Sequence, residues 1–335
     1  MEFPKVSIII PTYNRAHYLE QAIKSVLMQD YSNLEIIVSD NASTDNTQDV
    51  IRRFLYDKRL TYIRNPKNLG SILNWRNALY DYSSGEWVLI LSDDDYLIDK
   101  SYIFKAIELI NQYQNICLVH ANYIIKDENL KKITKTDFNL PEFIDGKAYF
   151  LYYRQKDFPH IHSTLTCLFN RVKALEVKAF SKDIYNADTS LWLRLMLNGN
   201  VGFIKDHVAV YRLHQGNESF NIDVNKDIDV LNDLKDIYCL AKNYYFLEND
   251  LNKWLERQVN FTFLWRFNIY LKMRKKRIAW ILFKEYYKNY PKVMKVFLKS
   301  KNLLMFVLVS NEKLLVLARQ IKKLFRKGAT YERGA

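Results

Sequence analysis

The sequence contains few of the residues that mark several protein classes. Of its 335 residues, 8 are glycine, 6 are proline and 3 are cysteine, whereas 49% are hydrophobic. Little glycine and a high apolar content exclude a disordered or low-complexity chain. The cysteines Cys117, Cys167 and Cys239 are widely separated and match no metal or disulfide spacing. We therefore expect three small core residues in a reducing compartment.

Long apolar segments are also missing. The longest apolar run near the C-terminus, residues 303–309, has seven residues, whereas a membrane span needs about 20. Residues 1–14 hold only a short apolar run with an early proline, which does not predict a secretory signal peptide. These observations lead us to expect a cytoplasmic chain.

The net charge of +13 is unevenly distributed. From Lys253 onward there are 21 Lys and Arg and 4 Asp and Glu, so the residues before it hold 29 and 33 of the two kinds. The basicity therefore belongs to a C-terminal module, which is also rich in aromatic residues.

The most informative stretch is Leu-Ile-Leu-Ser-Asp-Asp-Asp at residues 89–95. Its continuous apolar part predicts a buried strand, and the strand ends in Asp93, Asp94 and Asp95. Three adjacent carboxylates repel one another, so a cation is expected near them, and oxygen ligands suit Mg²⁺ or Mn²⁺. The alternative is an acidic turn that merely closes a strand.

Apolar strands alternate with amphipathic helices in the first half of the chain. Strands are predicted at residues 6–10, 34–39, 60–64, 86–91 and 116–125. This order predicts an α/β fold with a Rossmann-like, largely parallel sheet covered on both faces, and with ligands beyond the carboxyl ends of the strands. Residues 11–15, Asp40 and the acidic cluster all lie at those ends, so they converge on one edge.

The second half is less regular. Residues 163–169, 201–204 and 208–213 are predicted to form three strands, and Asp188 is expected to be the N-cap of a helix that Gly199 ends. A carboxylate there also suits a general base. His160 and His162 would share one face of a strand; a zinc pair lacks an obvious third ligand, so we favour a role in lining a substrate cleft.

Six motifs in this order resemble the inverting glycosyltransferases of family 2, which have a GT-A fold. They are residues 6–15, residues 40–45, Asn68-Leu69-Gly70 with Arg76 and Asn77, residues 92–95, Asp188, and residues 211–214. The resemblance covers about residues 4–220. It implies a nucleotide-sugar-binding catalytic domain at 1–220, followed by a basic helical module at 221–335.

The resemblance also implies a role for each motif. Binding of the nucleotide sugar falls to Pro11, Thr12, Asn14, Arg15, Asp40, Asn68, Gly70, Arg76 and Asp93. The metal ion, Mn²⁺ or Mg²⁺, falls to Asp94, Asp95 and His214, with Asp94 as first choice, and Asp188 is the catalytic base. Two departures stand out: Ser92 begins a motif that often reads Asp-Ala-Asp-Asp, and Ala187 replaces the usual Glu before Asp188.

The function implied is metal-dependent transfer of a sugar, with inversion, from a nucleotide diphosphate to a hydroxyl of a glycan acceptor. Asp40 favours a UDP-sugar, and the acceptor is expected to be lipid-linked, as in surface polysaccharide (O-antigen or capsule) synthesis. The alternative, suggested by Ala187, is a non-catalytic sugar-nucleotide-binding or scaffold protein. A nucleotidyltransferase would need a glycine-rich first loop, and residues 11–15 contain no glycine.

The last helical pattern, residues 313–327, has a basic and an apolar side. Such a helix suits an anionic membrane surface, although a helix packed on the core with a solvated basic face would have the same pattern. No nucleic-acid-binding module is recognisable. We therefore expect a peripheral protein at the inner face of the cell membrane.

Overall fold

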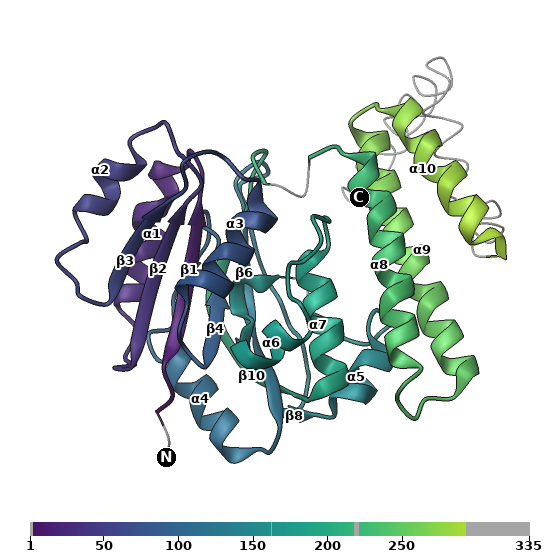
Figure 1. Cartoon of the computed structure of the whole chain (residues 1–335), viewed down its shortest axis with the longest axis horizontal. Helices are drawn as coiled ribbons and strands as arrows, with labels where there is room; N and C mark the ends of the chain where they lie inside the picture. Colours follow the sequence, from purple (N-terminus) through teal and green to yellow (C-terminus); the bar gives the residue numbers. More distant parts are fainter. Residues whose placement is uncertain (1–2, 162, 218–220, 293–335) are drawn as a thin grey trace, which may run out of the picture.

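The computed structural model describes residues 3–161, 163–217 and 221–292 (Figure 1). In these residues one sheet of ten strands has the order β3-β2-β1-β4-β9-β6-β10-β5, and β7 and β8 pair with β6 and β10. The strands are β1 (Val6–Thr12), β2 (Leu34–Asp40), β3 (Leu60–Arg64), β4 (Trp87–Ile90), β5 (Tyr96–Leu97), β6 (Ile116–Asp127), β7 (Lys132–Lys135), β8 (Phe143–Ile144), β9 (Leu168–Asn170) and β10 (Asn200–Leu213).

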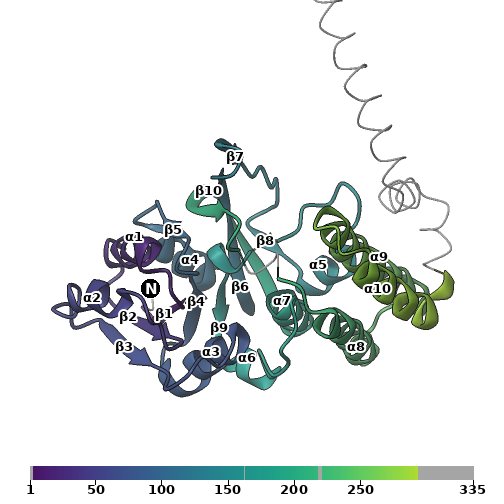
Figure 2. The same ribbon diagram turned by 90° about the horizontal axis from the view of Figure 1, so that it is seen from above.

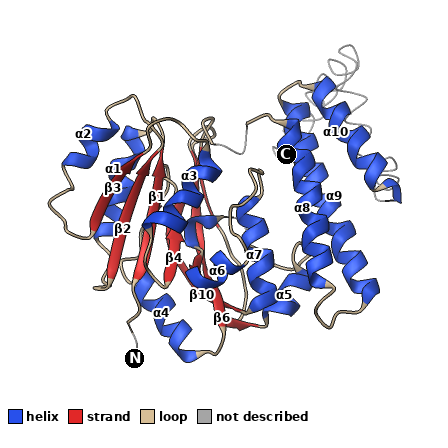
Figure 3. Cartoon of the chain, in the orientation of Figure 1, coloured by secondary structure: helices blue, strands red, loops and turns tan. Residues whose placement is uncertain are grey.

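Helices cover both faces of this sheet (Figure 3). They are α1 (Ala16–Leu27), α2 (Thr47–Arg52), α3 (Ser71–Asn77), α4 (Tyr102–Gln112), α5 (Gly146–Tyr152), α6 (Arg171–Glu176), α7 (Ala187–Asn198), α8 (Val224–Ala241), α9 (Glu248–Lys272) and α10 (Lys276–Asn289). A π-helical turn, Ala78–Tyr82, extends α3.

The sheet is parallel where the sequence predicted it, across β3, β2, β1 and β4. Beyond β4 it becomes mixed, because β9 enters antiparallel to both β4 and β6. Two predictions were wrong here. Residues 201–204 and 208–213 belong to one strand, β10, because register shifts between Ile204 and Ala209 let it bend without ending. Of residues 163–169, predicted as one strand, Thr164–Thr166 form a 3₁₀ turn and only the last two belong to the short β9.

Alternation along β1 divides the core into two clusters. Ile9 points into one cluster, whereas Ile8 and Ile10 point into the other, as the two-residue period of a strand requires. Helices α1, α2 and α4 contribute to the cluster around Ile8, and α3 and α5 to α10 contribute to the cluster around Ile9. Apolar burial on both faces fixes the strand ends, and the loops that follow them, in place.

The helices α8, α9 and α10 lie together beside α5 and α7 (Figure 2). Trp254 of α9 stacks on Phe150 of α5 with ring centroids 4.4 Å apart, and both side chains are buried. The three helices α8, α9 and α10 are thus part of one apolar cluster with α7. The predicted basic helix at 313–327 lies outside the described residues.

Two further expectations concern single residues and the membrane. Cys117 and Cys167 are buried as expected, but Cys239 is exposed, because it lies on the outer side of α8. Among the described residues, no helix combines the length and the apolar character needed to cross a bilayer.

Candidate active site

A cavity of about 490 Å³ lies at the carboxyl ends of β1 and β4. Nine of the residues singled out from the sequence line it: Pro11, Thr12, Arg15, Asn68, Gly70, Asp93, Asp94, Asp95 and Asp188. Asn14, Asp40, Arg76 and His214 do not contribute to its lining. The convergence predicted from the strand order therefore occurs, and it brings Asp188 of α7 to the same cavity.

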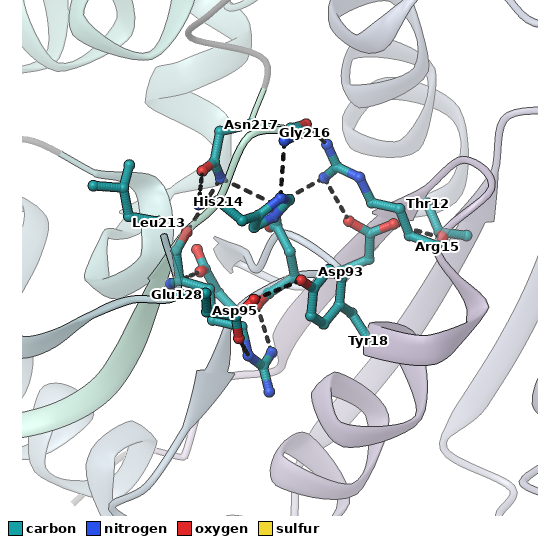
Figure 4. Close-up of polar contacts among 12 residues, drawn as sticks. Thr12, Arg15, Tyr18, Asp93, Asp95, Glu128, Leu213, His214, Gly216 and Asn217 are labelled. Carbon is teal, nitrogen blue, oxygen red and sulfur yellow. Dashed lines mark hydrogen bonds and ion pairs between the residues drawn. The ribbon is translucent and has the colours of Figure 1, made fainter. Parts of the chain in front are cut away.

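The acidic cluster is held by the loop after β1. Arg15 Nη1 donates to Asp93 Oδ1 at 3.1 Å and to Asp94 Oδ2 at 2.8 Å, and Thr12 Oγ1 donates to Asp93 Oδ2 at 2.7 Å (Figure 4). Burial, with the neighbouring Asp94 carboxylate, raises the pKa of Asp93 to about 6, although Arg15 opposes the shift. The carboxylates of the cluster thus bring negative charge into a buried part of the protein.

The donor set of the cluster suits a divalent ion that is shared with a diphosphate. His214 Nε2 lies 3.0 Å from Asp94 Oδ2, a spacing compatible with two ligands of one ion, and Asn217 Nδ2 donates to the same oxygen at 3.3 Å. No group of three or more His, Cys, Asp or Glu in the described residues is arranged to hold a metal. Carboxylate and phosphate oxygens are the usual ligands of Mg²⁺ or Mn²⁺, so Asp94 would be the main protein ligand of such an ion, with His214 next to it.

Asp95 has a different environment from Asp94. The backbone N–H of Arg212 donates to Asp95 Oδ1 at 2.8 Å, and the Arg212 guanidinium lies over the rings of Tyr18 and Tyr96. Arg212 Nη1 also donates to the carbonyl oxygen of Asp94 at 2.5 Å. Asp95 therefore ties the end of β10 to the acidic loop, and Arg212, which sequence reasoning did not select, is central to that connection.

Asn14 and Asp40 lie outside the cavity lining and make hydrogen bonds within the loops after β1 and β2. Asn14 has a left-handed backbone (φ 53°), and its Oδ1 accepts from Thr44 N at 2.7 Å. Asp40 is fully buried, and its two oxygens accept from Ser43 N at 2.8 Å and from Tyr62 Oη at 2.7 Å. Asn14 thus joins the loop after β1 to the loop after β2, and Asp40 joins the loop after β2 to β3.

Asn41, which was not selected from the sequence, links the second loop to the third. Its Oδ1 accepts from Leu69 N at 2.9 Å, and its Nδ2 donates to Asn68 Oδ1 at 2.9 Å and to the Gly70 carbonyl at 3.2 Å. It also lines the cavity. The available signal was its place directly after Asp40 at a strand end. Arg76 lies over the ring of Tyr80, 4.6 Å from its centroid.

Asp188 lies inside the first turn of α7, where Asn186 is the N-cap, so the predicted N-cap position was wrong by two residues. Its Oδ1 accepts from the backbone N–H of Thr189 at 2.6 Å. Burial raises the pKa of Asp188 to about 6, although the Thr189 N–H and the positive charge of Arg154 oppose the shift. A carboxylate that titrates near neutral pH suits a general base.

Another wall of the cavity is formed by segments for which the sequence predicted no role. Four residues form this wall: Tyr185 from the turn before α7, Asn221 from the segment before α8, Lys226 from α8 and Trp265 from α9. The only signal in the sequence was the aromatic and basic character of the C-terminal part. His160, expected in a cleft, is not part of the lining; its ring lies near those of Tyr153 and Phe261. His162 lies outside the described residues.

Comparison with known sequences identifies relatives. The family model "Glycosyl transferase family 2" matches residues 7–177. A GalNAc(5)-diNAcBac-PP-undecaprenol beta-1,3-glucosyltransferase from Campylobacter jejuni is 32% identical over 63% of this chain and 65% of its own length. UDP-Glc:alpha-D-GlcNAc-diphosphoundecaprenol beta-1,3-glucosyltransferase WfgD from Escherichia coli is 29% identical over 72% of this chain and 90% of its own length. The chain thus spans just under two-thirds of the first relative.

Solved structures share the fold. TarS 1–349 of S. aureus in complex with UDP-GlcNAc has a TM-score of 0.65 at 18% identity, with 88% of this chain and 92% of that chain covered. The mannosyltransferase PcManGT from Pyrobaculum calidifontis, in complex with GDP-Man and Mn²⁺, has a TM-score of 0.55 at 18% identity, with 98% and 89% covered. The match over half of the chain, together with this fold, makes the chain a member of glycosyltransferase family 2 with the GT-A fold.

Proposed function

We propose that this family 2 glycosyltransferase transfers a sugar, with inversion and with the help of a divalent ion, from a UDP-sugar to a hydroxyl of a lipid-linked glycan. The observation that carries the proposal is one cavity that contains the loop after β1, the acidic cluster after β4 and the partly buried side chain of Asp188. The names of the Campylobacter jejuni and Escherichia coli relatives refer to lipid-linked glycan acceptors, which supports the acceptor class and a role in surface polysaccharide synthesis.

The UDP donor is supported by TarS, which was solved with UDP-GlcNAc, and by Asp40 at the end of β2. Asp40 makes its two bonds inside the protein, so it would act on a base through the loop that it fixes. Thermal-shift measurements with UDP-, GDP- and dTDP-sugars in Mn²⁺ test this choice. Stabilisation by UDP-sugars alone is expected; stabilisation by GDP-sugars alone would replace the donor in the proposal.

Asp94 and His214 would hold the divalent ion, with Asp93 kept in place by Arg15 and Thr12. A bound ion would neutralise the negative charge that develops on the leaving diphosphate. Arg15 would add positive charge on the same side of the cavity, because its guanidinium lies between two of the acids.

Asp188 would accept the proton of the acceptor hydroxyl as that oxygen attacks the anomeric carbon. Inversion requires a base on the face of the anomeric carbon opposite to the leaving group, and Asp188 is available for this role because it lines the same cavity as the acidic cluster but comes from α7. The anomeric configuration of the product, read by NMR from one turnover of donor of known configuration, tests inversion. A chain that binds UDP-sugars with Mn²⁺ yet never releases UDP would instead be the non-catalytic binding protein that Ala187 suggests.

Association with an anionic membrane surface at the cytoplasmic face completes the proposal. It is supported by the excess of Lys and Arg after Lys253 and by α10, which exposes Trp280 and Tyr287 beside Lys284. Trp and Tyr favour the membrane interface, and basic residues favour anionic lipids. Flotation with anionic vesicles, but not with neutral ones, is expected; failure to float with either kind would contradict membrane association.

A further inference from the structure

The cavity wall formed by Tyr185, Asn221, Lys226 and Trp265 has no part in the donor chemistry described above. In chain order, these residues belong to the turn before α7, the segment before α8, α8 and α9. They are far apart in the sequence and face the same cavity as Asp188. Contacts outside the loops after β1, β2 and β4 must therefore keep these four residues in position.

A buried ion pair lies directly behind this wall. Arg266 Nε is 2.6 Å from Asp227 Oδ1 in an ion pair that is not aligned as a hydrogen bond, and the two residues are 1% and 0% exposed. Tyr270 Oη also donates to Asp227 Oδ2. Burying two charges is costly, so this pair contributes more to the position of its neighbours than to the free energy of folding.

Each member of the wall is attached to that pair. Asp227 follows Lys226, and Arg266 follows Trp265, along their helices. Arg266 Nη2 donates to the carbonyl of Asn221 at 2.8 Å, and its guanidinium lies 4.0 Å from the ring centroid of Tyr185. The ion pair thus sets the positions of one cation and two aromatic rings at the edge of the cavity.

The wall offers the chemistry that a charged glycoconjugate needs. The indole of Trp265 is only partly buried, and aromatic faces pack well against the apolar face of a sugar ring. Lys226 Nζ is paired with Asp183 at 2.7 Å, but Asp183 is 61% exposed, so the pair is worth little and can be exchanged for a ligand. A phosphate oxygen would be a stronger partner for the ammonium group.

We propose that Trp265, Tyr185 and Lys226 form the acceptor subsite, in which the rings contact the acceptor sugar and Lys226 contacts the phosphate that links this sugar to its lipid. The proposal deepens the proposed function and rests on it. It assigns to α8 and α9 the selection of a phosphate-linked acceptor, whereas the loops after β1, β2 and β4 hold the donor.

Two acceptors separate the two contacts. One is an N-acetylhexosamine linked through diphosphate to a short-chain prenol, and the other is the same sugar as a neutral octyl glycoside. Lys226→Gln should weaken binding of the diphosphate-linked acceptor about 10-fold and leave binding of the octyl glycoside unchanged. Trp265→Ala should weaken both about 10-fold. Calorimetry in the presence of UDP and Mn²⁺ measures acceptor binding without relying on turnover.

Controls come from the end of α8 and the turn after it. Lys242→Gln, at the C-cap of α8, and Tyr245→Ala, a fully exposed aromatic residue between α8 and α9, should bind both acceptors as the wild type does. UDP binding by every variant reports that the donor side is intact. Equal effects of Lys226→Gln on both acceptors, no effect of either wall variant, or no binding of either acceptor by the wild type would overturn the subsite. A wild-type protein that does not bind UDP, or that does not cleave a UDP-sugar, would instead contradict the proposed function.

Discussion

His214 Nε2 lies 3.0 Å from Asp94 Oδ2, although the two residues are 120 positions apart in the chain. Asn217 keeps this arrangement, because its Oδ1 accepts from His214 N at 2.6 Å while its Nδ2 donates to Asp94 Oδ2. The turn after β10 is thus folded onto the acidic loop after β4. This contact makes His214, which does not line the cavity, part of the same charged centre.

The first prediction is that His214→Ala raises the Mn²⁺ concentration for half-maximal transfer about 10-fold, because the variant lacks one of the two protein ligands that we propose for the ion, while the phosphates would still bind it. Titration of activity with Mn²⁺ at saturating donor measures it. His207→Asn is the matched control, since His207 lies on β10, just upstream of His214, but contacts the carbonyl of Thr136. An unchanged Mn²⁺ requirement in His214→Ala would remove this residue from the metal site.

The second prediction concerns Arg15, which is 2.8 Å from Asp94 and 3.1 Å from Asp93. Arg15→Gln leaves two buried carboxylates without this cation, so we expect a loss of about 2 kcal/mol in the free energy of unfolding without metal. Mn²⁺ should then stabilise the variant more than it stabilises the wild type, because it replaces the missing charge. Thermal unfolding with and without Mn²⁺ measures both effects.

The control for Arg15 is Arg52→Gln. Arg52 pairs with Asp49, and both side chains are about two-thirds exposed or more, so its removal should change stability little. If Mn²⁺ stabilised Arg15→Gln and the wild type equally, Arg15 would not be compensating the acids that face the ion.

The parallel half of the sheet and the convergence of its loops could be predicted from sequence, because apolar strands that end in Asp40 or in Asp93 carry both signals in a few adjacent residues. The insertion of β9 between β4 and β6 could not. Its three residues, Leu168–Asn170, have no periodicity of their own, and their place depends on which strand edges remain unpaired.

Site residues were predictable where the motif itself is local. Arg212 and Asn41 were missed because their importance comes from contacts across the chain: Arg212 reaches the carbonyl of Asp94, and Asn41 reaches Asn68. The wall around Trp265 was missed for the same reason. Its members are linked through the buried pair of Asp227 and Arg266, and the separation of these two residues in the sequence follows no recognisable pattern.

The third prediction concerns Gly70, whose backbone has φ 83° and ψ 160°, a region that only glycine occupies readily. A Cβ at this position would meet no atom within 4 Å, so the whole effect of Gly70→Ala is backbone strain, about 1–3 kcal/mol. The loop would relieve that strain by moving, which would break the bond from Asn41 to the Gly70 carbonyl. We expect UDP to bind more weakly by about 10-fold, measured by calorimetry. Wild-type UDP affinity would show that this loop does not close on the donor.

The last prediction concerns Asp188, whose pKa is raised to about 6 by burial. As a general base it must be ionised, so kcat/KM should rise as pH increases through about 6 and level off above it. Asp188→Asn should lose at least about 100-fold in transfer while UDP binding persists. Asp206→Asn is the control, because Asp206 is 59% exposed and pairs with Lys105 at the surface.

The raised pKa of Asp188 suits catalysis by a base, but it lowers the stability of the folded chain. A carboxyl whose pKa is higher in the folded chain than its ordinary value of 3.8 binds its proton more tightly when folded, so it destabilises the fold as pH rises from about 4 to about 6 and remains unfavourable above that. Asp188→Asn removes that cost. At pH 7.5 the variant should therefore unfold at a higher temperature than the wild type. Its free energy of unfolding should be greater by at most about 3 kcal/mol, and this difference should vanish near pH 4. A variant that is inactive and less stable at pH 7.5 would mean that Asp188 supports the first turn of α7 instead of serving as a buried base.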